Sequence, residues 1–231
     1  TGDVIIPQGV KKVNGISGQP SSIYFPEGVE EIGTLWSFDY NYGHVAYKST
    51  PLRFLKGDLK LPSTLKKIGD GAFYGSNISH VSIPEGIEII PKYSFGYTSL
   101  TDTLTIPNSV VQIKDFAFRV CKYLNAIILS ENLSQIWGNC MDGCWSLDYI
   151  QCNAKEPPLV EGGEFTGIEK NNFTLVVPEG SVDAYRNAPG WKEFKRISAY
   201  RNFVCRPMKA KLLNKSNVRT VILNADGNWE M

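Results

Sequence analysis

The sequence predicts a repeat solenoid that is mainly β, with short turns and 3-10 segments and with a parallel sheet on one side. Three observations support this prediction. The segments Val81-Ser82-Ile83-Pro84, Leu104-Thr105-Ile106-Pro107 and Ile127-Ile128-Leu129-Ser130 follow one another at a period of 23 residues. Apolar positions behind these segments recur in register, and Pro or Gly interrupts the repeats. A fixed period of this length is typical of stacked coils, each of which buries its apolar side only against its neighbours.

Three in-register columns are expected to fill the interior of the coils. Within each strand, the alternation of side chains predicts that Val81 and Ile83 point inward and Ser82 points outward. A helical interpretation is excluded because Pro or Gly interrupts each coil and the apolar runs are short and alternating. The columns are Ile87, Val110 and Leu133; Ile90, Ile113 and Ile136; and Phe95, Phe118 and Met141.

A recurring tripeptide marks the turn after a strand. Pro-Gln-Gly occupies residues 7–9, and Pro-Glu-Gly occupies residues 26–28, 84–86 and 178–180. We predict a type I turn there, with Pro at the second position and Gly at the fourth. The glutamates Glu27, Glu85 and Glu179 then recur because they belong to a turn, and their recurrence does not indicate a catalytic carboxylate pair.

The strand ends can be followed along most of the chain. We assign residues 1–197 to the solenoid, with about eight coils and a C-terminal cap at 178–197, and residues 198–231 to a short extension. In the cap, Ser181 is expected to N-cap a short helix, and Trp191 and Phe194 are expected to pack on the last strand. In the extension, 203–213 and 218–223 are interpreted as a β-hairpin. The strand ends are Pro7, Pro26, Pro62, Pro84, Pro107, Ser130, Asn153 and Pro178.

The start of the chain suggests a mature or trimmed form, because Thr1 is neither an initiator Met nor part of a signal peptide. No polar capping unit precedes Val4-Ile5-Ile6. Solenoid ends need caps, so we expect upstream residues to cover the first coil. No apolar run approaches the roughly 18 residues of a membrane span.

Charge is distributed unevenly, although the net charge is only +1. Residues 1–185 carry a net charge of −6, whereas residues 186–219 carry +9. This basic segment is either a solvated surface strip or a contact for an anionic partner. The motifs of nucleic-acid-binding folds are absent, so no nucleic-acid partner is expected.

The five cysteines do not form a secreted disulfide framework, because their number is odd. The spacing of Cys140, Cys144 and Cys152 resembles a metal site. The repeat alignment instead places Cys140 and Cys144 in columns of small residues, which favours buried structural thiols. Cys121 and Cys144 lie one coil apart, about 4.8 Å if the coils pair like strands. Stacked thiols and a disulfide both fit that separation.

The Leu-Thr-Ile-Pro-x-Ser-Val-x-x-Ile-x-x-x-Ala-Phe cadence at 104–118 resembles the BspA-like leucine-rich repeats of bacterial surface proteins. The ending that runs from Val177-Pro178-Glu179-Gly180-Ser181 to Phe194 resembles the C-terminal cap of the Bacteroidetes members. The resemblance covers residues 4–197. It implies a right-handed solenoid in a cell-surface or secreted protein that is used in adhesion or ligand binding, with no catalytic motif to transfer.

No enzyme is expected from the residues themselves. The chain has two histidines, and it lacks Gly-x-Ser-x-Gly, Walker-type and dinucleotide motifs. No metal site or cofactor is predicted.

The candidate ligand-binding residues fall into two groups. One is an aromatic insertion in the second coil, which is 36 residues long where the later coils need about 23. Tyr and Trp offer an apolar face and a polar group, which suits both sugar stacking and protein contacts. The other group lies at equivalent outward positions of successive strands. Thr103 and Ala126 occupy this column between its two candidates. The candidates are Trp36, Tyr40, Tyr42, His44 and Tyr47 in the insertion, and His80 and Tyr149 in the column.

Two functions follow from this distribution. The first is a monomeric adhesion or binding module that recognises a host protein or a glycan, including extracellular matrix, through the sheet and the insertion. The second is a structural spacer in the cell envelope with no ligand of its own. For the insertion itself, a further alternative is that its rings cover the first coils. Phe38 aligns with Phe73 and is assigned to the interior.

Overall fold

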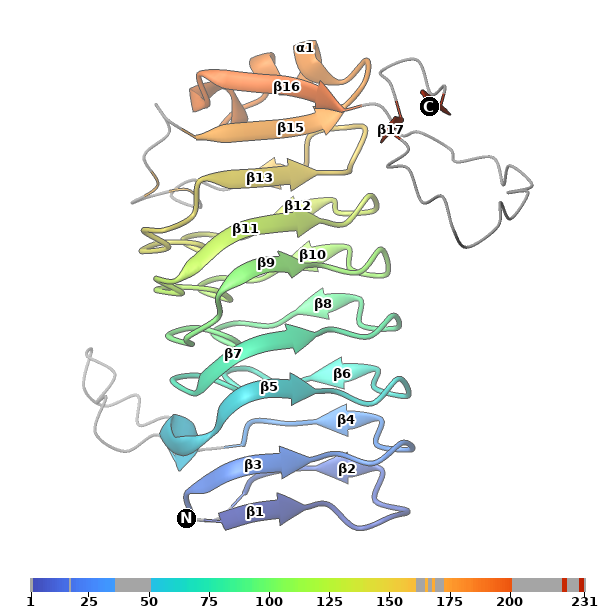
Figure 1. Cartoon of the computed structure of the whole chain (residues 1–231), viewed down its shortest axis with the longest axis vertical. Coiled ribbons are helices and arrows are strands. Elements are labelled where there is room, and N and C mark those ends of the chain that lie inside the picture. The colour runs from blue at the N-terminus through green and yellow to red at the C-terminus, as the bar shows by residue number, and fades with distance from the viewer. Residues whose placement is uncertain are drawn as a thin grey trace. The chain divides into compact units, whose positions relative to one another are not determined.

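The computed structural model describes residues 2–16, 18–35, 51–160, 165, 168, 173–200, 222–223 and 229–230. The chain divides into two units, Thr1–Tyr200 and Arg201–Met231. The first unit is a solenoid of stacked parallel strands, as the sequence predicts (Figure 1). The second unit contributes β17 (Ile222–Leu223) and β18 (Trp229–Glu230), which pair antiparallel. The predicted hairpin segment 203–213 lies outside the described residues, and β18 was not part of that prediction.

A front sheet is built from one strand of each coil, and the strands stack one above another (Figure 1). The hydrogen-bonded pairs among the described front strands are parallel. Ladder hydrogen bonds divide these strands into three groups, β1–β3, β5–β7 and β9–β11–β13–β15–β16. The front strands are β1 (Gly2–Ile5), β3 (Pro20–Tyr24), β5 (Lys56–Lys60), β7 (Asn77–Ser82), β9 (Asp102–Thr105), β11 (Leu124–Leu129), β13 (Tyr149–Cys152), β15 (Thr174–Pro178) and β16 (Arg196–Tyr200).

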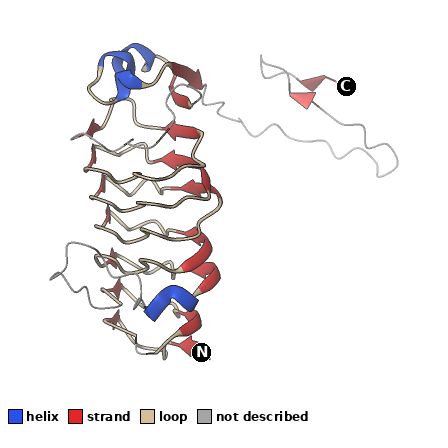
Figure 2. Cartoon of the chain, turned by 90° about the vertical axis from the view of Figure 1, so that its left-hand side faces the viewer, coloured by secondary structure: helices blue, strands red, loops and turns tan. Residues whose placement is uncertain are grey.

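A back sheet of two-residue strands lies on the other side of the interior (Figure 2). Each back strand presents one inward residue, and Ile90, Ile113 and Ile136 pair in register and are fully buried. The predicted column is therefore confirmed. The back strands are β2 (Lys12–Val13), β4 (Glu31–Ile32), β6 (Lys67–Ile68), β8 (Ile89–Ile90), β10 (Gln112–Ile113), β12 (Gln135–Ile136) and β14 (Leu159–Val160).

The interior between the sheets is filled by the other two predicted columns. Phe95, Phe118 and Met141 are fully buried. The ring of Phe95 stacks on Phe73 with centroids 5.4 Å apart and on Phe118 with centroids 5.8 Å apart. Ile87, Val110 and Leu133 are also buried. On the front strand, Ile83 is buried, Val81 is partly buried against the core and Ser82 is exposed.

The turns after the strands differ from the predicted type. Val29 N–H donates to Pro26 O over 3.4 Å, so Pro is the first residue of the turn and Gly the third. Gly28 has a φ of 99° there. A positive φ at the third position belongs to a type II turn, which explains the glycine. The glutamate between them has a structural role, because Glu27 accepts hydrogen bonds from the backbone and hydroxyl of Ser63 in the next coil.

The cap closes the C-terminal end with α1 (Val182–Asn187) and η2 (Trp191–Glu193). Trp191 and Phe194 are buried and pack with Phe165, while Trp191 Nε1 donates to Pro158 O over 2.8 Å. Ser181 occupies the N-cap position, but its side chain makes no capping hydrogen bond, so the predicted cap interaction is wrong.

The cap also supplies a strand, β16, which was not among the elements predicted for residues 178–197. Strand β16 pairs parallel with β15, with Ile197 opposite Leu175. The last front strand of the solenoid is therefore β16 rather than β15, and the cap carries the sheet one strand further before it ends.

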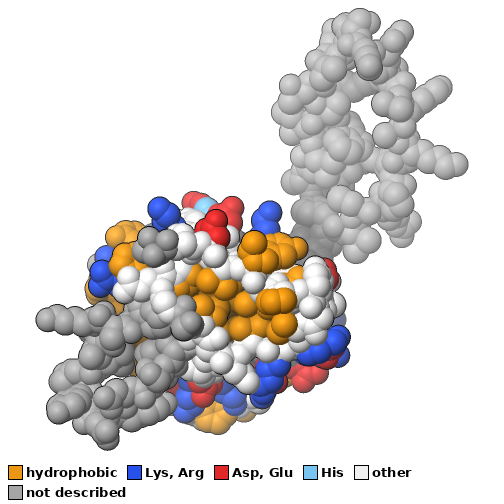
Figure 3. Space-filling view, turned by 90° about the horizontal axis from the view of Figure 1, so that it is seen from below, with side chains coloured by type: hydrophobic (Ala, Val, Ile, Leu, Met, Phe, Trp, Pro, Cys, Tyr) orange, Lys and Arg blue, Asp and Glu red, His pale blue; other side chains and the backbone are white. Residues whose placement is uncertain are grey.

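The N-terminal end presents a different surface. Figure 3 looks onto that end and shows apolar side chains gathered at its centre. Val4, Ile6, Val10 and Ile16 of the first coil pack on the core but remain only partly buried.

A further short helix, η1 (Pro51–Phe54), precedes β5. Among the described residues, no helix has the length and apolar character needed to cross a membrane.

Replacing Phe118 by Ala should lower the free energy of unfolding by about 3–5 kcal/mol, because a fully buried ring is removed from a stack. Urea denaturation measures the change. Tyr123→Ala is the matched control, because that ring is 48% exposed, and it should change the free energy by less than about 0.5 kcal/mol. A loss below about 1 kcal/mol for Phe118→Ala would contradict the stacked interior.

A chain that ends at Pro178 should aggregate. It would lose Trp191 and Phe194 from the end of the core, and it would leave β15 with unpaired backbone groups and no β16. Size-exclusion chromatography and light scattering would detect the oligomers. If the shortened chain stayed monomeric and equally stable, the capping role would be wrong.

Candidate functional site

The outward face of the front sheet holds both described candidates. The strand registers place Asp58 opposite His80 on β5 and β7. They also place Thr103, Ala126 and Tyr149 side by side on β9, β11 and β13. His80 is exposed and Tyr149 is half-buried. The sheet therefore carries a polar position on β7 and an aromatic one on β13, separated by small side chains.

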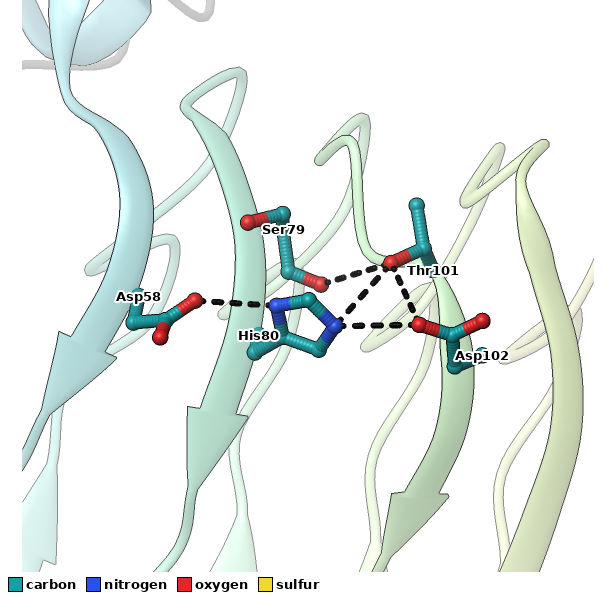
Figure 4. Close-up of polar contacts among 5 residues, drawn as sticks. All are labelled: Asp58, Ser79, His80, Thr101 and Asp102. Atoms are coloured by element: carbon teal, nitrogen blue, oxygen red, sulfur yellow. Dashed lines mark hydrogen bonds and ion pairs between the residues drawn. The ribbon is translucent and has the colours of Figure 1, made fainter.

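His80 lies between two carboxylates from the neighbouring strands (Figure 4). Its Nδ1 is 2.9 Å from Asp58 Oδ1, and its Nε2 is 3.1 Å from Asp102 Oδ2. Thr101 Oγ1 lies 3.3 Å from the same Nε2 and donates to Asp102 Oδ2 over 3.3 Å. We call Asp58, His80, Thr101 and Asp102 the histidine bracket. It spans three coils and crosses the break in the ladder between β7 and β9.

Backbone irregularities bring the two carboxylates to the histidine. The register of β5 on β7 shifts between Gly57 and Asp58, and Gly57 has a φ of 79°. Asp102 has a φ of 53°, a left-handed conformation in which Asp is one of the more tolerated residues. An alignment of the strand ends alone places Asp58 beside His80. On the other side of His80, the same alignment places Thr103 rather than Asp102.

The electrostatics of the bracket favour the protonated ring. Carboxylates accept hydrogen bonds, so a ring that bonds to one at each nitrogen donates from both and is an imidazolium. The hydrogen bonds to Asp102 and then to Asp58 raise the pKa of His80. The hydrogen bond from His80 is also the main cause that lowers the pKa of Asp102. All three side chains are more than half exposed, so solvent and salt screen the interaction.

The bracket superficially resembles a nucleophile, base and acid in Thr101, His80 and Asp58. A general base must accept the proton of the nucleophile, however, and an imidazolium that already donates from Nε2 to Asp102 has no lone pair to do so. The group also lies on the open face of the front sheet, where His80 and both carboxylates are more than half exposed. The arrangement can bind anionic or hydrogen-bonding groups, but it does not activate Thr101.

Tyr149 belongs to a second polar network further along the sheet. Its hydroxyl donates to Gln151 Oε1 over 3.1 Å, and Gln151 Nε2 donates to Asn153 Oδ1 over 2.8 Å. Tyr200 on β16 donates to the same Asn153 oxygen over 2.8 Å. The network fixes the ring of Tyr149 on the surface, which suits it to contact a ligand with little loss of side-chain entropy.

The aromatic insertion cannot be placed against this face. Trp36, Tyr40, Tyr42, His44 and Tyr47 all lie outside the described residues, as does Phe38. They remain candidates on the sequence alone.

Two hollows in the described surface lie on the back sheet, away from both candidates. A groove of about 770 Å³ crosses the ends of β4, β6 and β8, with Gly33 and Gly69 on its floor and the ion-paired Glu31 and Lys67 on one wall. Packing requires the glycine at position 69, because a Cβ there would lie 2.6 Å from the backbone carbon of Gly33. Within the described part of the chain, no group of His, Cys, Asp and Glu side chains could hold a metal ion.

The pKa of His80 should exceed its ordinary value of about 6.5, and it should fall in Asp102→Asn and in Asp58→Asn. The raised pKa adds stability that is complete below the unfolded pKa and lost as the pH rises through the folded one. The lowered pKa of Asp102 adds stability above about pH 4, lost as the pH falls. His80→Gln should therefore destabilise most between about pH 4.5 and 6.5.

Proton NMR of the imidazole C–H signals measures the first effect, since the chain has only two histidines, and urea denaturation across pH measures the second. His44→Gln assigns the resonances and is the control. An unshifted pKa for His80 would show that the bracket does not form in solution.

The repeat pattern also matches a known family. A family model described as the BspA type leucine rich repeat region matches residues 45–157 in six copies. No curated protein matches the sequence. The matched range contains the stacked phenylalanines and both strands that flank His80. With the parallel coils and in-register columns described above, this match identifies residues 45–157 as BspA-type leucine-rich repeats and supports a BspA-like leucine-rich repeat protein.

Proposed function

We propose that this solenoid is a monomeric, cell-surface or secreted adhesion module that binds a host protein or glycan through the outward face of its front sheet. Proteins with BspA-type repeats are usually surface or secreted interaction modules, and the family is non-catalytic. The proposal goes further by assigning the contact to one face and two groups of residues, His80 with its bracket and Tyr149 with its network.

The observation that carries the proposal is the arrangement of the outward column. Its centre, Thr103 and Ala126, is small, so a ligand can lie flat across the strands. A cationic group lies beyond one side of this centre, at His80, and a fixed phenol beyond the other, at Tyr149. An aromatic anchor beside charged groups is the composition that dominates binding energy in protein interfaces.

A structural spacer is the alternative, and a specific set of contacts favours it. The turns are tied from coil to coil by side chains, as where Glu85 accepts from the backbone N–H groups of Asn108 and Ser109 and Asn108 donates to Glu131. Such ties stiffen a rod whether or not it binds anything. They lie in the turns after the strands, however, and do not explain the bracket on the sheet face.

A panel of extracellular-matrix proteins and glycans, tested for binding to the immobilised protein, separates the two functions. We expect at least one ligand, and we expect Tyr149→Ala and His80→Gln to weaken it tenfold or more while the melting temperature changes little. Ile89→Ala is the matched control, because Ile89 is an exposed apolar residue on the back sheet. A panel without any ligand, or a ligand equally weakened by Ile89→Ala, would favour the spacer.

The insertion is tested separately with the double variant Tyr40→Ala/Tyr42→Ala. If the rings bind the ligand, the variant keeps its melting temperature and loses affinity. If they cover the first coils instead, the variant melts several degrees lower and keeps its affinity for any ligand of the front sheet.

A further inference from the structure

Two exposed aromatic side chains occupy the edge of the solenoid where the front strands begin. Trp145 is 67% exposed and Tyr123 is 48% exposed. They lie in the turns directly before β13 and β11, and these two strands begin on the left-hand side of Figure 1. Neither ring contributes to the interior columns, so packing of the coils does not account for them.

The register of the coils brings these two residues together. Ala126 pairs with Tyr149, 23 residues later, and Asp148 N–H donates to Asn125 O over 3.1 Å in the same register. The same offset places Trp145 beside Lys122 and one residue from Tyr123. With strands about 4.8 Å apart and a rise of about 3.3 Å per residue, the Cα atoms of Tyr123 and Trp145 are roughly 6 Å apart.

Polar side chains surround the two rings. Ser146 and Asp148 are exposed in the turn before β13, and Asn125 is exposed near the start of β11. Their side chains make no hydrogen bond to any residue that the structure describes. Lys122 places its Nζ 4.8 Å from the centre of the Tyr123 ring. The surface therefore combines flat apolar faces with an amide, a hydroxyl and a carboxylate that are free to bond. We call residues 122, 123, 125, 145, 146 and 148 the aromatic edge.

We infer that the aromatic edge binds a neutral carbohydrate chain. The C–H face of a pyranose ring stacks on an exposed indole or phenol, and its hydroxyl groups both donate and accept, which matches amide and carboxylate partners. Neighbouring coils are about 4.8 Å apart. The two rings on successive coils are therefore close enough for neighbouring sugar units of one chain to contact both.

The charge and shape of the edge select this ligand over others. The charges of Lys122 and Asp148 balance, so a strongly anionic glycan gains no net attraction. Tyr123 and Trp145 line neither of the two hollows on the back sheet. A protein side chain that anchors an interface needs a pocket, whereas a sugar ring needs only a flat face.

Affinity electrophoresis tests this inference. The probes are four neutral polysaccharides, dextran, xyloglucan, galactomannan and yeast mannan, each set in a native gel, with hyaluronan as the anionic comparison. We expect at least one neutral polysaccharide to retard the protein. Trp145→Ala should weaken that retardation tenfold or more and Tyr123→Ala less, while neither changes the melting temperature. Tyr24→Ala is the matched control, because Tyr24 is an exposed ring on β3.

The inference would be overturned by a lack of retardation by any neutral polysaccharide or by retardation by hyaluronan alone. Equal retardation of Trp145→Ala and the unaltered protein would also overturn it. This test can fail while the binding test of the front sheet succeeds, and the reverse is also possible, because the two surfaces use different residues. Loss of sugar binding in Tyr149→Ala but not in Trp145→Ala would move the sugar to the front sheet and also overturn this assignment.

Discussion

The stacking of equivalent side chains, one coil upon the next, is the constraint on which the rest of the structure depends. The rings of Phe73, Phe95 and Phe118 lie within 19° and 9° of parallel in successive pairs. A coil that slipped by one residue would turn its whole inward set to the outside and would break this stack. The position of every outward residue, including His80 and Trp145, is therefore fixed by rings that lie in the interior.

The inward columns were predictable because the buried side chains must recur at the same position in each coil, and this recurrence is visible in the sequence. The backbone details were not. The turn type depended on whether Pro26 begins the turn or follows its first residue, and only the hydrogen bond from Val29 decides between them. Tyr93 and Phe116 adopt positive φ, at a cost of about 1–2 kcal/mol each. Their rings stack on one another at 4.7 Å, a compensation between coils that no local pattern reveals.

The candidate surfaces show the same division. His80 could be placed on the outward column from the alternation of its strand, and the strand ends align Asp58 with it. Asp102 could not be found that way, because it lies 22 residues after His80 and reaches it through a left-handed backbone conformation. Tyr123 and Trp145 did have a signal in the sequence: two aromatic residues outside every inward column.

The repeat period constrains only the side chains that are buried between the coils. The inward columns would therefore be the same in a binding module and in a spacer. The argument for binding must come from side chains that folding leaves unexplained. The buried Trp191 and Tyr185 fill the cap and donate to Pro158 O and Ala154 O, as expected of amphipathic rings that serve the fold. Trp145 keeps 67% of its surface in water and fills no core. Covering that apolar face with a ligand would release the hydration cost that the free protein carries.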